Sequence, residues 1–152
     1  MKVLFAVNLT EPIEAVRTVE SLCDRLDAEL YVLHVDVPLQ ADLGSLDASG
    51  FEGGHYSYAQ FDPDLAEEIE QVLESAFKRF LQRSFVRPIR MMIRESGDPA
   101  TTIIHDADRT GADILVLARK HHPFLERLVV GSVSTKVIKA AKIPVLLIPI
   151  AE

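Results

Sequence analysis

The stretch from Gly111 to Pro149 decides the fold, and it reads GADILVLARKHHPFLERLVVGSVSTKVIKAAKIPVLLIP. An apolar strand at Ile114–Leu117 is followed by a basic loop, Arg119 to His122, and then by a short helix that Gly131-Ser132 opens. A second apolar strand follows at Val145–Ile148. The first N–H groups of a helix lack partners within it, and the helix dipole is positive at that end. This stretch therefore predicts a parallel β/α unit with an anion site at the helix start.

Short apolar runs and amphipathic helices alternate along the rest of the chain as well. The expected strands are Val3–Val7, Leu30–Val35, Ile89–Ile93, Ile114–Leu117 and Val145–Ile148. Apolar residues at helical spacing follow Pro12, Pro63 and Pro99, and Asp62 and Asp98 are suited to cap the last two of these helices. Apolar runs of this length, with helices between them, are typical of strands buried on both faces of a sheet. The pattern predicts one α/β domain over residues 1–152, with helices on both faces of an open five-stranded parallel sheet.

Two expected helices have clear apolar faces, and the segment between 36 and 62 has none. On the first helix the apolar residues are Ile13, Val16, Val19, Leu22 and Leu26. On the second they are Leu65, Ile69, Val72, Leu73, Ala76, Phe77, Phe80 and Leu81. Residues 36–62 contain Pro38 and several glycines but no sustained apolar period, so we expect a long mobile loop there.

The composition limits which binding partners and which cellular compartment we expect. The net charge of -7 argues against a broad nucleic-acid-binding face. The single cysteine, Cys23, excludes an internal disulfide and is typical of a reducing compartment. No apolar run approaches the roughly 18 residues of a membrane span. We therefore expect a cytoplasmic protein with neither nucleic-acid nor membrane partners.

Several short segments, in this order and spacing, resemble the universal stress protein family over nearly the whole chain. They are the opening strand with a polar residue after it, Leu33-His34-Val35, Gly97-Asp98-Pro99, Ala112–Val116, Gly131–Ser134 and Ile143-Pro144-Val145. The resemblance implies a Rossmann-like sheet of order 3-2-1-4-5 and a role in the stress response. In such sheets ligands bind where the strand order reverses, here between the first and fourth strands. Asn8-Leu9-Thr10 and Ala118–His122 would meet at that point.

The chain departs from the ATP-binding signature of the family it resembles. That signature is G-x2-G-x9-G followed by Ser or Thr, and the matching positions here are Ala118, His121 and Gly131-Ser132. The family commonly has Asp where this chain has Asn8. We therefore expect ATP to bind weakly or not at all, AMP or a phosphate-like anion to be tolerated better, and no cofactor to be required. The candidate binding residues are Val7, Asn8, Thr10, Val35, Ala118, Arg119, His121, Gly131, Ser132, Val133 and Ser134.

Two classes of function remain open, a non-enzymatic regulatory protein and an enzyme of related fold. The five histidines show no metal-ligand spacing, so no metal site is expected. Residues 131–135 do not match the nucleophile elbow of a Ser-His-Asp hydrolase, and we assign no catalytic residue. Nucleotide hydrolases and ligases of related fold are recognised by a Ser-Gly-Gly loop after the first strand or by adenylation signatures that contain His, and Asn8–Pro12 has neither. We favour the non-enzymatic interpretation, with a nucleotide hydrolase or ligase-like enzyme as the alternative.

The last strand also predicts an oligomer. In the implied order it is an edge, and an uncovered apolar edge tends to pair with another chain. It carries no charge, and Pro144 and Pro149 bracket it. We expect an antiparallel homodimer through Val145, Leu146, Leu147 and Ile148, as the resemblance also implies. Other protein partners remain open.

Overall fold

A five-stranded parallel sheet forms the centre of the structure, a computed structural model that describes residues 1–37, 40–41, 56–57, 62–120 and 131–150. Its strands are β1 (Lys2–Val7), β2 (Glu29–Asp36), β5 (Met91–Ser96), β6 (Ile114–Lys120) and β7 (Val145–Ile150). They lie in the order β5-β2-β1-β6-β7, and every neighbouring pair is parallel. Counted along the chain, this is the order 3-2-1-4-5, so the predicted topology is confirmed.

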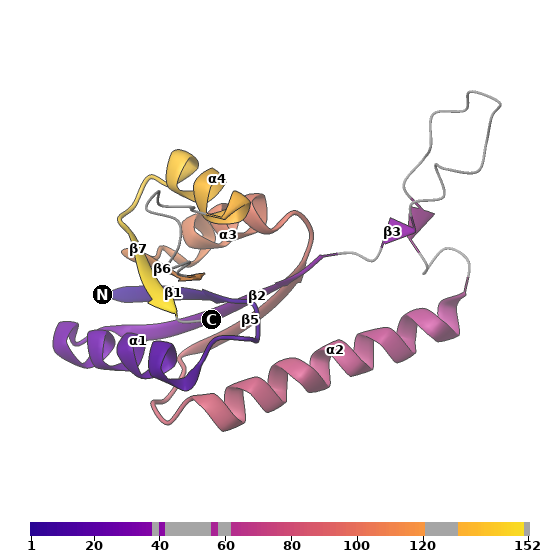
Figure 1. Cartoon of the computed structure of the whole chain (residues 1–152), viewed down its shortest axis with the longest axis horizontal. Helices are drawn as coiled ribbons and strands as arrows, with labels where there is room; N and C mark the ends of the chain where they lie inside the picture. Colours follow the sequence, from indigo (N-terminus) through magenta and orange to yellow (C-terminus); the bar gives the residue numbers. More distant parts are fainter. Residues whose placement is uncertain (38–39, 42–55, 58–61, 121–130, 151–152) are drawn as a thin grey trace.

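Four helices cover the two faces of the sheet. Figure 1 shows α3 (Pro99–Thr110) and α4 (Ser132–Ala140) above it, and α1 (Ile13–Leu26) and α2 (Pro63–Ser84) below it. Side chains alternate between the faces of a strand, so Val3 and Phe5 pack toward α1 and α2, while Leu4 packs toward α3. Each strand of the centre thus contributes to two cores.

The predicted helix caps are present. Asp62 accepts hydrogen bonds from the N–H groups of Asp64 and Leu65, at 3.1 and 3.2 Å, and Pro63 occupies the first turn of α2. Asp98 accepts from the N–H of Thr101 at 3.0 Å at the start of α3. These caps satisfy N–H groups that have no acceptor within the helix, which explains why both helices begin where the sequence indicates.

Two strand boundaries differ from the prediction. The strand expected at Ile89–Ile93 runs instead from Met91 to Ser96, because its charged C-terminal residues lie at the sheet edge, where Arg94 forms ion pairs with Asp36 and Glu70. The last strand continues through Pro149 to Ile150, so the prolines do not bracket it. An edge strand tolerates this proline, since its outer side needs no N–H donor.

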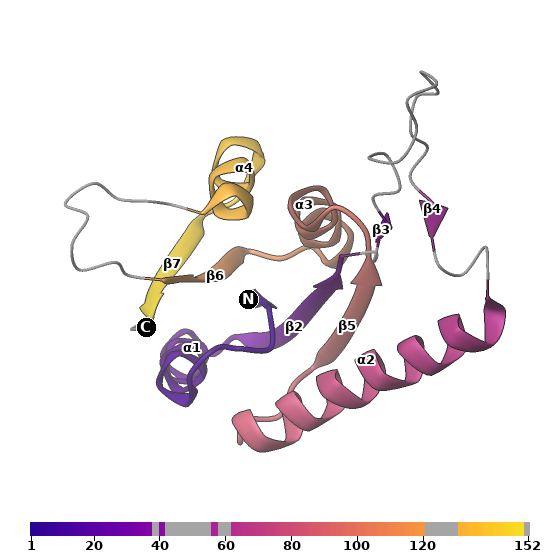
Figure 2. The same cartoon turned by 45° about the vertical axis from the view of Figure 1, so that its right-hand side comes forward.

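Helix α2 buries less of its apolar face than expected. Phe77, Phe80 and Leu81 are buried, whereas Leu65 and Val72 are 40% and 63% exposed. Its N-terminal half projects beyond the sheet in both views (Figures 1 and 2), so it lies out of reach of the core. The first helix behaves similarly at its two ends, where Ile13 and Leu26 are exposed.

Most of the segment 36–62 lies outside the described residues. Within it, β3 (Gln40–Ala41) and β4 (Tyr56–Ser57) form a two-residue antiparallel pair. The expectation of a long mobile loop stays a prediction. Among the described helices, none has both the length and the apolar character needed to cross a bilayer.

Candidate functional site

A cavity of about 280 Å³ lies at the carboxyl ends of the central strands. β2 and β6 flank β1 there, which is the point where the strand order reverses. Pockets of parallel sheets are expected at this position. The lining residues are Ala6, Val7, Asn8, Glu11, Leu33, Val35, Val37, Pro99, Ile103, Leu117, Ala118, Val133 and Ser134.

The loop after β1 is held in one shape by its own side chains. The Asn8 side-chain oxygen accepts hydrogen bonds from the N–H and the hydroxyl of Thr10, at 2.9 and 2.6 Å. The Glu11 Oε1 atom in turn accepts from the N–H of Asn8 at 2.8 Å. Leu9 between them adopts a left-handed φ of 70°, which costs on the order of 1 kcal/mol for a residue with a Cβ atom. The acceptor oxygen of Asn8, expected to meet a ligand, is therefore engaged within the loop.

Glu11 is a cavity residue that the sequence analysis did not identify. It is only 6% exposed, and its second carboxylate oxygen, Oε2, is buried without a hydrogen-bond partner among the described residues. Burial raises the pKa of this carboxyl, although hydrogen bonds from the backbone and the charge of His34 oppose the shift. A signal was present in the sequence, because Asn8 and Glu11 have the N-x-x-E spacing of a capping box, in which the acid reaches back to the first backbone N–H.

His34 has a structural role beside this loop. Its Nδ1 atom lies 2.8 Å from the carbonyl oxygen of Val7, and its Nε2 atom lies 3.1 Å from Asp36. Its ring stacks on Phe77 of α2, with the ring centroids 5.9 Å apart. These contacts tie the ends of β1 and β2 to α2 and leave neither ring nitrogen free for chemistry.

The structure brings some of the predicted binding residues together and leaves others aside. Those that line the cavity are Val7, Asn8, Val35, Ala118, Val133 and Ser134. Thr10, Arg119, Gly131 and Ser132 are described but do not line it, and His121 lies outside the described residues.

The start of α4 forms the far end of the site. Gly131 is the N-cap residue, and a Cβ atom added to it would meet nothing within 4 Å. Gly131 has no side chain that could cap the helix, so its own position offers no side-chain acceptor to the first N–H groups of α4. Val133 and Ser134 of the first turn lie in the cavity wall. This end of the site has the features that suit an anion.

The described lining is mostly apolar, with an amide, a carboxyl group and a hydroxyl as its polar groups and no cationic side chain. Such a surface suits an uncharged, flat molecule with a few hydrogen-bonding groups. No group of three or more His, Cys, Asp or Glu residues in the described part of the chain could hold a metal ion.

Sequence comparison agrees with the fold. The sequence pattern of the universal stress protein family matches residues 1–149. The chain belongs to the universal stress protein family. The resemblance carried by the short segments quoted above is thereby confirmed, and the protein is a member of a stress-response family.

Relatives and solved structures of other universal stress proteins cover nearly the whole chain. The universal stress protein MJ0531 of Methanocaldococcus jannaschii is 29% identical over 138 residues, which are 90% of this chain and 74% of the relative. Universal stress protein UspA from Lactobacillus plantarum has the same fold, with a TM-score of 0.68, 20% identity and 97% of each chain covered. A further universal stress protein, solved in complex with cAMP, aligns with a TM-score of 0.57 and 18% identity over 98% of this chain and 96% of its own.

Proposed function

We propose that this universal stress protein is a non-enzymatic regulatory protein whose cavity binds an adenine nucleotide weakly. The observation that carries the proposal is the cavity at the reversal of strand order, with apolar walls and the start of α4 at one end. Apolar walls suit the base of a nucleotide, and the helix start suits one phosphate or a similar anion. The solved relative in complex with cAMP makes adenine nucleotides the natural ligands to test.

The chain is poorly equipped to hold a triphosphate. Ala118 lines the cavity at a position where the family signature has glycine, and its methyl group occupies space near the backbone. His121 replaces the second glycine of the signature. The described lining contains the carboxyl group of Glu11 but no cation to balance several phosphates. We therefore infer that AMP binds better than ATP.

The lining also supports a binding role rather than catalysis. Among the described lining residues, Ser134 has the only hydroxyl group and Glu11 the only carboxyl group, and none of them is a histidine. A nucleophile needs a base within hydrogen-bond reach, and among the described residues no hydrogen bond joins Ser134 to Glu11, the carboxyl group of the lining. No specific observation favours the alternative of a nucleotide hydrolase or ligase.

Calorimetric titration with ATP and AMP tests the proposal. We expect AMP to bind more tightly than ATP, and ATP to have a dissociation constant above about 1 µM. Replacing Ala118 and His121 together by glycine should strengthen ATP binding, because it restores both glycines of the signature. The protein should release no phosphate or AMP from ATP during prolonged incubation.

The matched control is His105→Gly with Ala140→Gly, which makes the same two changes at exposed helix positions. It should leave ATP binding unchanged. Submicromolar ATP affinity in the unmodified protein, or turnover of ATP, would contradict the proposal. A double glycine variant that binds ATP no better would instead point to Asn8 or to the 36–62 segment as the part that blocks it.

A further inference from the structure

The Glu11 carboxyl group has one oxygen with a structural task and one without. Oε1 accepts the hydrogen bond from Asn8 that holds the loop after β1. Oε2, the other oxygen of this carboxyl group, is buried and has no hydrogen-bond partner in the described part of the chain. A buried polar atom without a partner costs free energy, and such atoms in native proteins are commonly completed by a ligand or a water molecule. Glu11 lines the cavity, so a bound molecule can complete Oε2 if the carboxyl group turns toward it.

The neighbouring polar groups do not compete for this role. The side-chain oxygen of Asn8 already accepts two hydrogen bonds from Thr10. Ser134 belongs to α4, whereas Glu11 belongs to the loop after β1. Glu11 Oε2 is therefore the acceptor on the β1 side of the cavity that has no partner in the described structure.

The charge of Glu11 also sets the direction of the ligand. A carboxylate repels phosphate, whereas the N-terminus of α4 attracts it. The titratable side chain that acts on Glu11 within the described residues is His34 of β2, and the other described lining residues carry no charge. A nucleotide would thus point its phosphate toward α4 and its uncharged part toward Glu11.

We propose that Glu11 is the specificity-determining residue of the cavity, where Oε2 accepts a hydrogen bond from a hydroxyl or amino hydrogen of a nucleoside. The inference rests on the proposed nucleotide-binding function and adds that the protein recognises the nucleoside part of the ligand. It gives a role to the second oxygen of a carboxyl group that lies in a largely apolar cavity, where its burial is unfavourable. The cavity selects for the nucleoside, and the helix start adds a weaker contact to phosphate.

Titration of the full-length protein with adenosine tests the inference, and two analogues separate the donors. 2′,3′-Dideoxyadenosine lacks the ribose 2′- and 3′-hydroxyls, and inosine lacks the amino group. One of the two should bind at least about tenfold more weakly than adenosine, since a hydrogen bond to a charged acceptor is worth about that factor or more. Glu11→Gln keeps an oxygen for the Asn8 bond but places an amide donor or a weaker neutral acceptor at Oε2. It should weaken adenosine binding about tenfold and abolish the difference between adenosine and the weaker analogue.

Glu14→Gln is the control, because it makes the same chemical change at an exposed position of the first turn of α1. It should bind adenosine like the unmodified protein. Equal binding of all three nucleosides by the unmodified protein would overturn the inference without needing any variant. So would a folded Glu11→Gln protein with unchanged affinity and discrimination. If the unmodified protein binds neither adenosine nor AMP, the proposed function itself fails, which is a distinguishable result.

Discussion

Glu11 and Glu20 are buried carboxyl groups only nine positions apart, and their pKa values are shifted in opposite directions. Burial raises the pKa of Glu11, which has one oxygen without a partner. Burial also acts on Glu20, but hydrogen bonds from Arg87, Arg17 and Val86 outweigh it and lower the pKa. Burial therefore outweighs the hydrogen bonds at Glu11, whereas at Glu20 the hydrogen bonds, one of them from the charged side chain of Arg17, outweigh burial.

The raised pKa of Glu11 predicts a loss of stability with increasing pH. The folded state holds this proton more tightly than the unfolded state, so the contribution of Glu11 to stability is fully present below its ordinary pKa of 4.5 and declines as the pH rises through the raised value. The decline is at most about 1.4 kcal/mol per pH unit. Glu11→Gln should lack this decline. Urea denaturation from pH 4 to 8 measures the free energy of unfolding of both proteins. If the two plots of this free energy against pH stay parallel, the prediction is wrong.

Gly131 provides a test that separates ligand contact from stability. Its φ of -56° suits any residue, and there is open space around a Cβ atom. Gly131→Ala should therefore change the free energy of unfolding by less than about 1 kcal/mol. We expect it to weaken AMP binding, because a methyl group would keep the phosphate away from the helix start.

Gly97→Ala is the comparison for this variant. Gly97 has a φ of 155°, and an added Cβ would lie 3.0 Å from the Thr102 hydroxyl. This change should destabilise the protein by on the order of 1 kcal/mol and leave the affinity of the folded fraction for AMP unaltered. Unchanged AMP binding in Gly131→Ala would show that phosphate does not approach that backbone.

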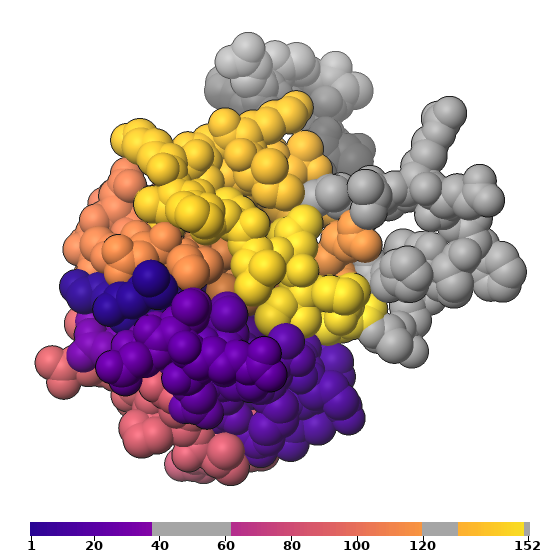
Figure 3. All heavy atoms as spheres, turned by 90° about the vertical axis from the view of Figure 1, so that its left-hand side faces the viewer, coloured from indigo at the N-terminus to yellow at the C-terminus, as the bar shows by residue number. Residues whose placement is uncertain are grey.

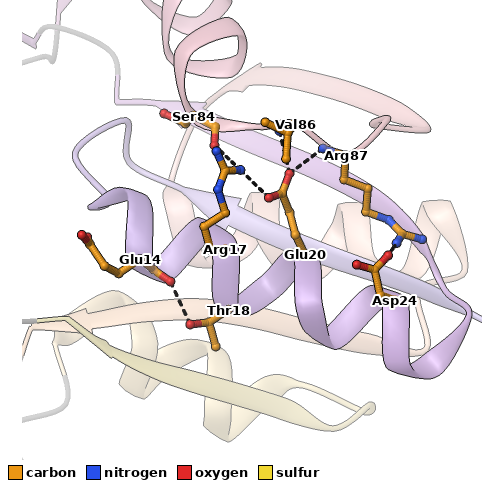
Figure 4. Close-up of polar contacts among 8 residues, drawn as sticks. All are labelled: Glu14, Arg17, Thr18, Glu20, Asp24, Ser84, Val86 and Arg87. Carbon is orange, nitrogen blue, oxygen red and sulfur yellow. Dashed lines mark hydrogen bonds and ion pairs between the residues drawn. The ribbon is translucent and has the colours of Figure 1, made fainter.

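At the scale of elements, Glu20 joins α1 to the connection between α2 and β5. Its Oε1 atom accepts hydrogen bonds from the N–H groups of Val86 and Arg87, at 2.8 and 2.7 Å, and Arg17 pairs with its other oxygen (Figure 4). Arg17 also donates to the carbonyl oxygen of Ser84 at 3.1 Å, and Arg87 donates to the carbonyl oxygen of Ala28 at 2.7 Å. One carboxylate thus accepts hydrogen bonds from two backbone N–H groups just after the end of α2.

Replacing Glu20 should loosen this connection. Glu20→Gln removes the charge that strengthens its hydrogen bonds. We therefore expect the free energy of unfolding to fall by about 1–3 kcal/mol, and hydrogen exchange to become faster at the N–H groups of Val86 and Arg87. The lowered pKa means that this stability is present above pH 4.5 and is lost as the pH falls through the folded-state value. The difference in free energy of unfolding between Glu20→Gln and the unmodified protein should therefore become smaller as the pH is lowered below 4.5. Glu14→Gln, on the exposed face of α1, should change stability by less than about 0.5 kcal/mol.

At the scale of the whole molecule, β7 is an open edge of the sheet in the described structure. Among the described strands it pairs with β6 alone, and Leu146 is 40% exposed. Figure 3 shows the C-terminal part of the chain, in yellow, at the surface beside α1. The N–H of Leu115 donates to the carbonyl oxygen of Pro144 at 3.0 Å, so the alternation of a parallel ladder directs the N–H groups of Val145 and Leu147 away from β6. No described strand pairs with these outward donors.

We predict a homodimer in which two β7 strands pair antiparallel. Val145→Pro removes an outward donor without breaking the ladder to β6, so it should weaken the dimer while the monomer stays folded. Val145→Thr, which keeps the N–H and nearly the same volume, should retain the dimer. Sedimentation equilibrium measures both. A monomeric parent protein at high concentration would refute the prediction, and Pro149 inside the strand already limits the pairing to its first half.

The sequence by itself determined the fold class, the strand order through the family resemblance, and the starts of α2 and α3. These features depend on local periodicity and on caps such as Asp62 and Asp98, which act within a few residues. The tertiary structure alone decided that Glu11 is buried, that Gly131 stands outside the cavity lining, and that the N-terminal half of α2 projects past the sheet. Each depends on which distant segments pack against the residue. A polar side chain before a helix is usually solvated, and only the convergence of β1, β2, β6 and α4 turns this one into the wall of a cavity.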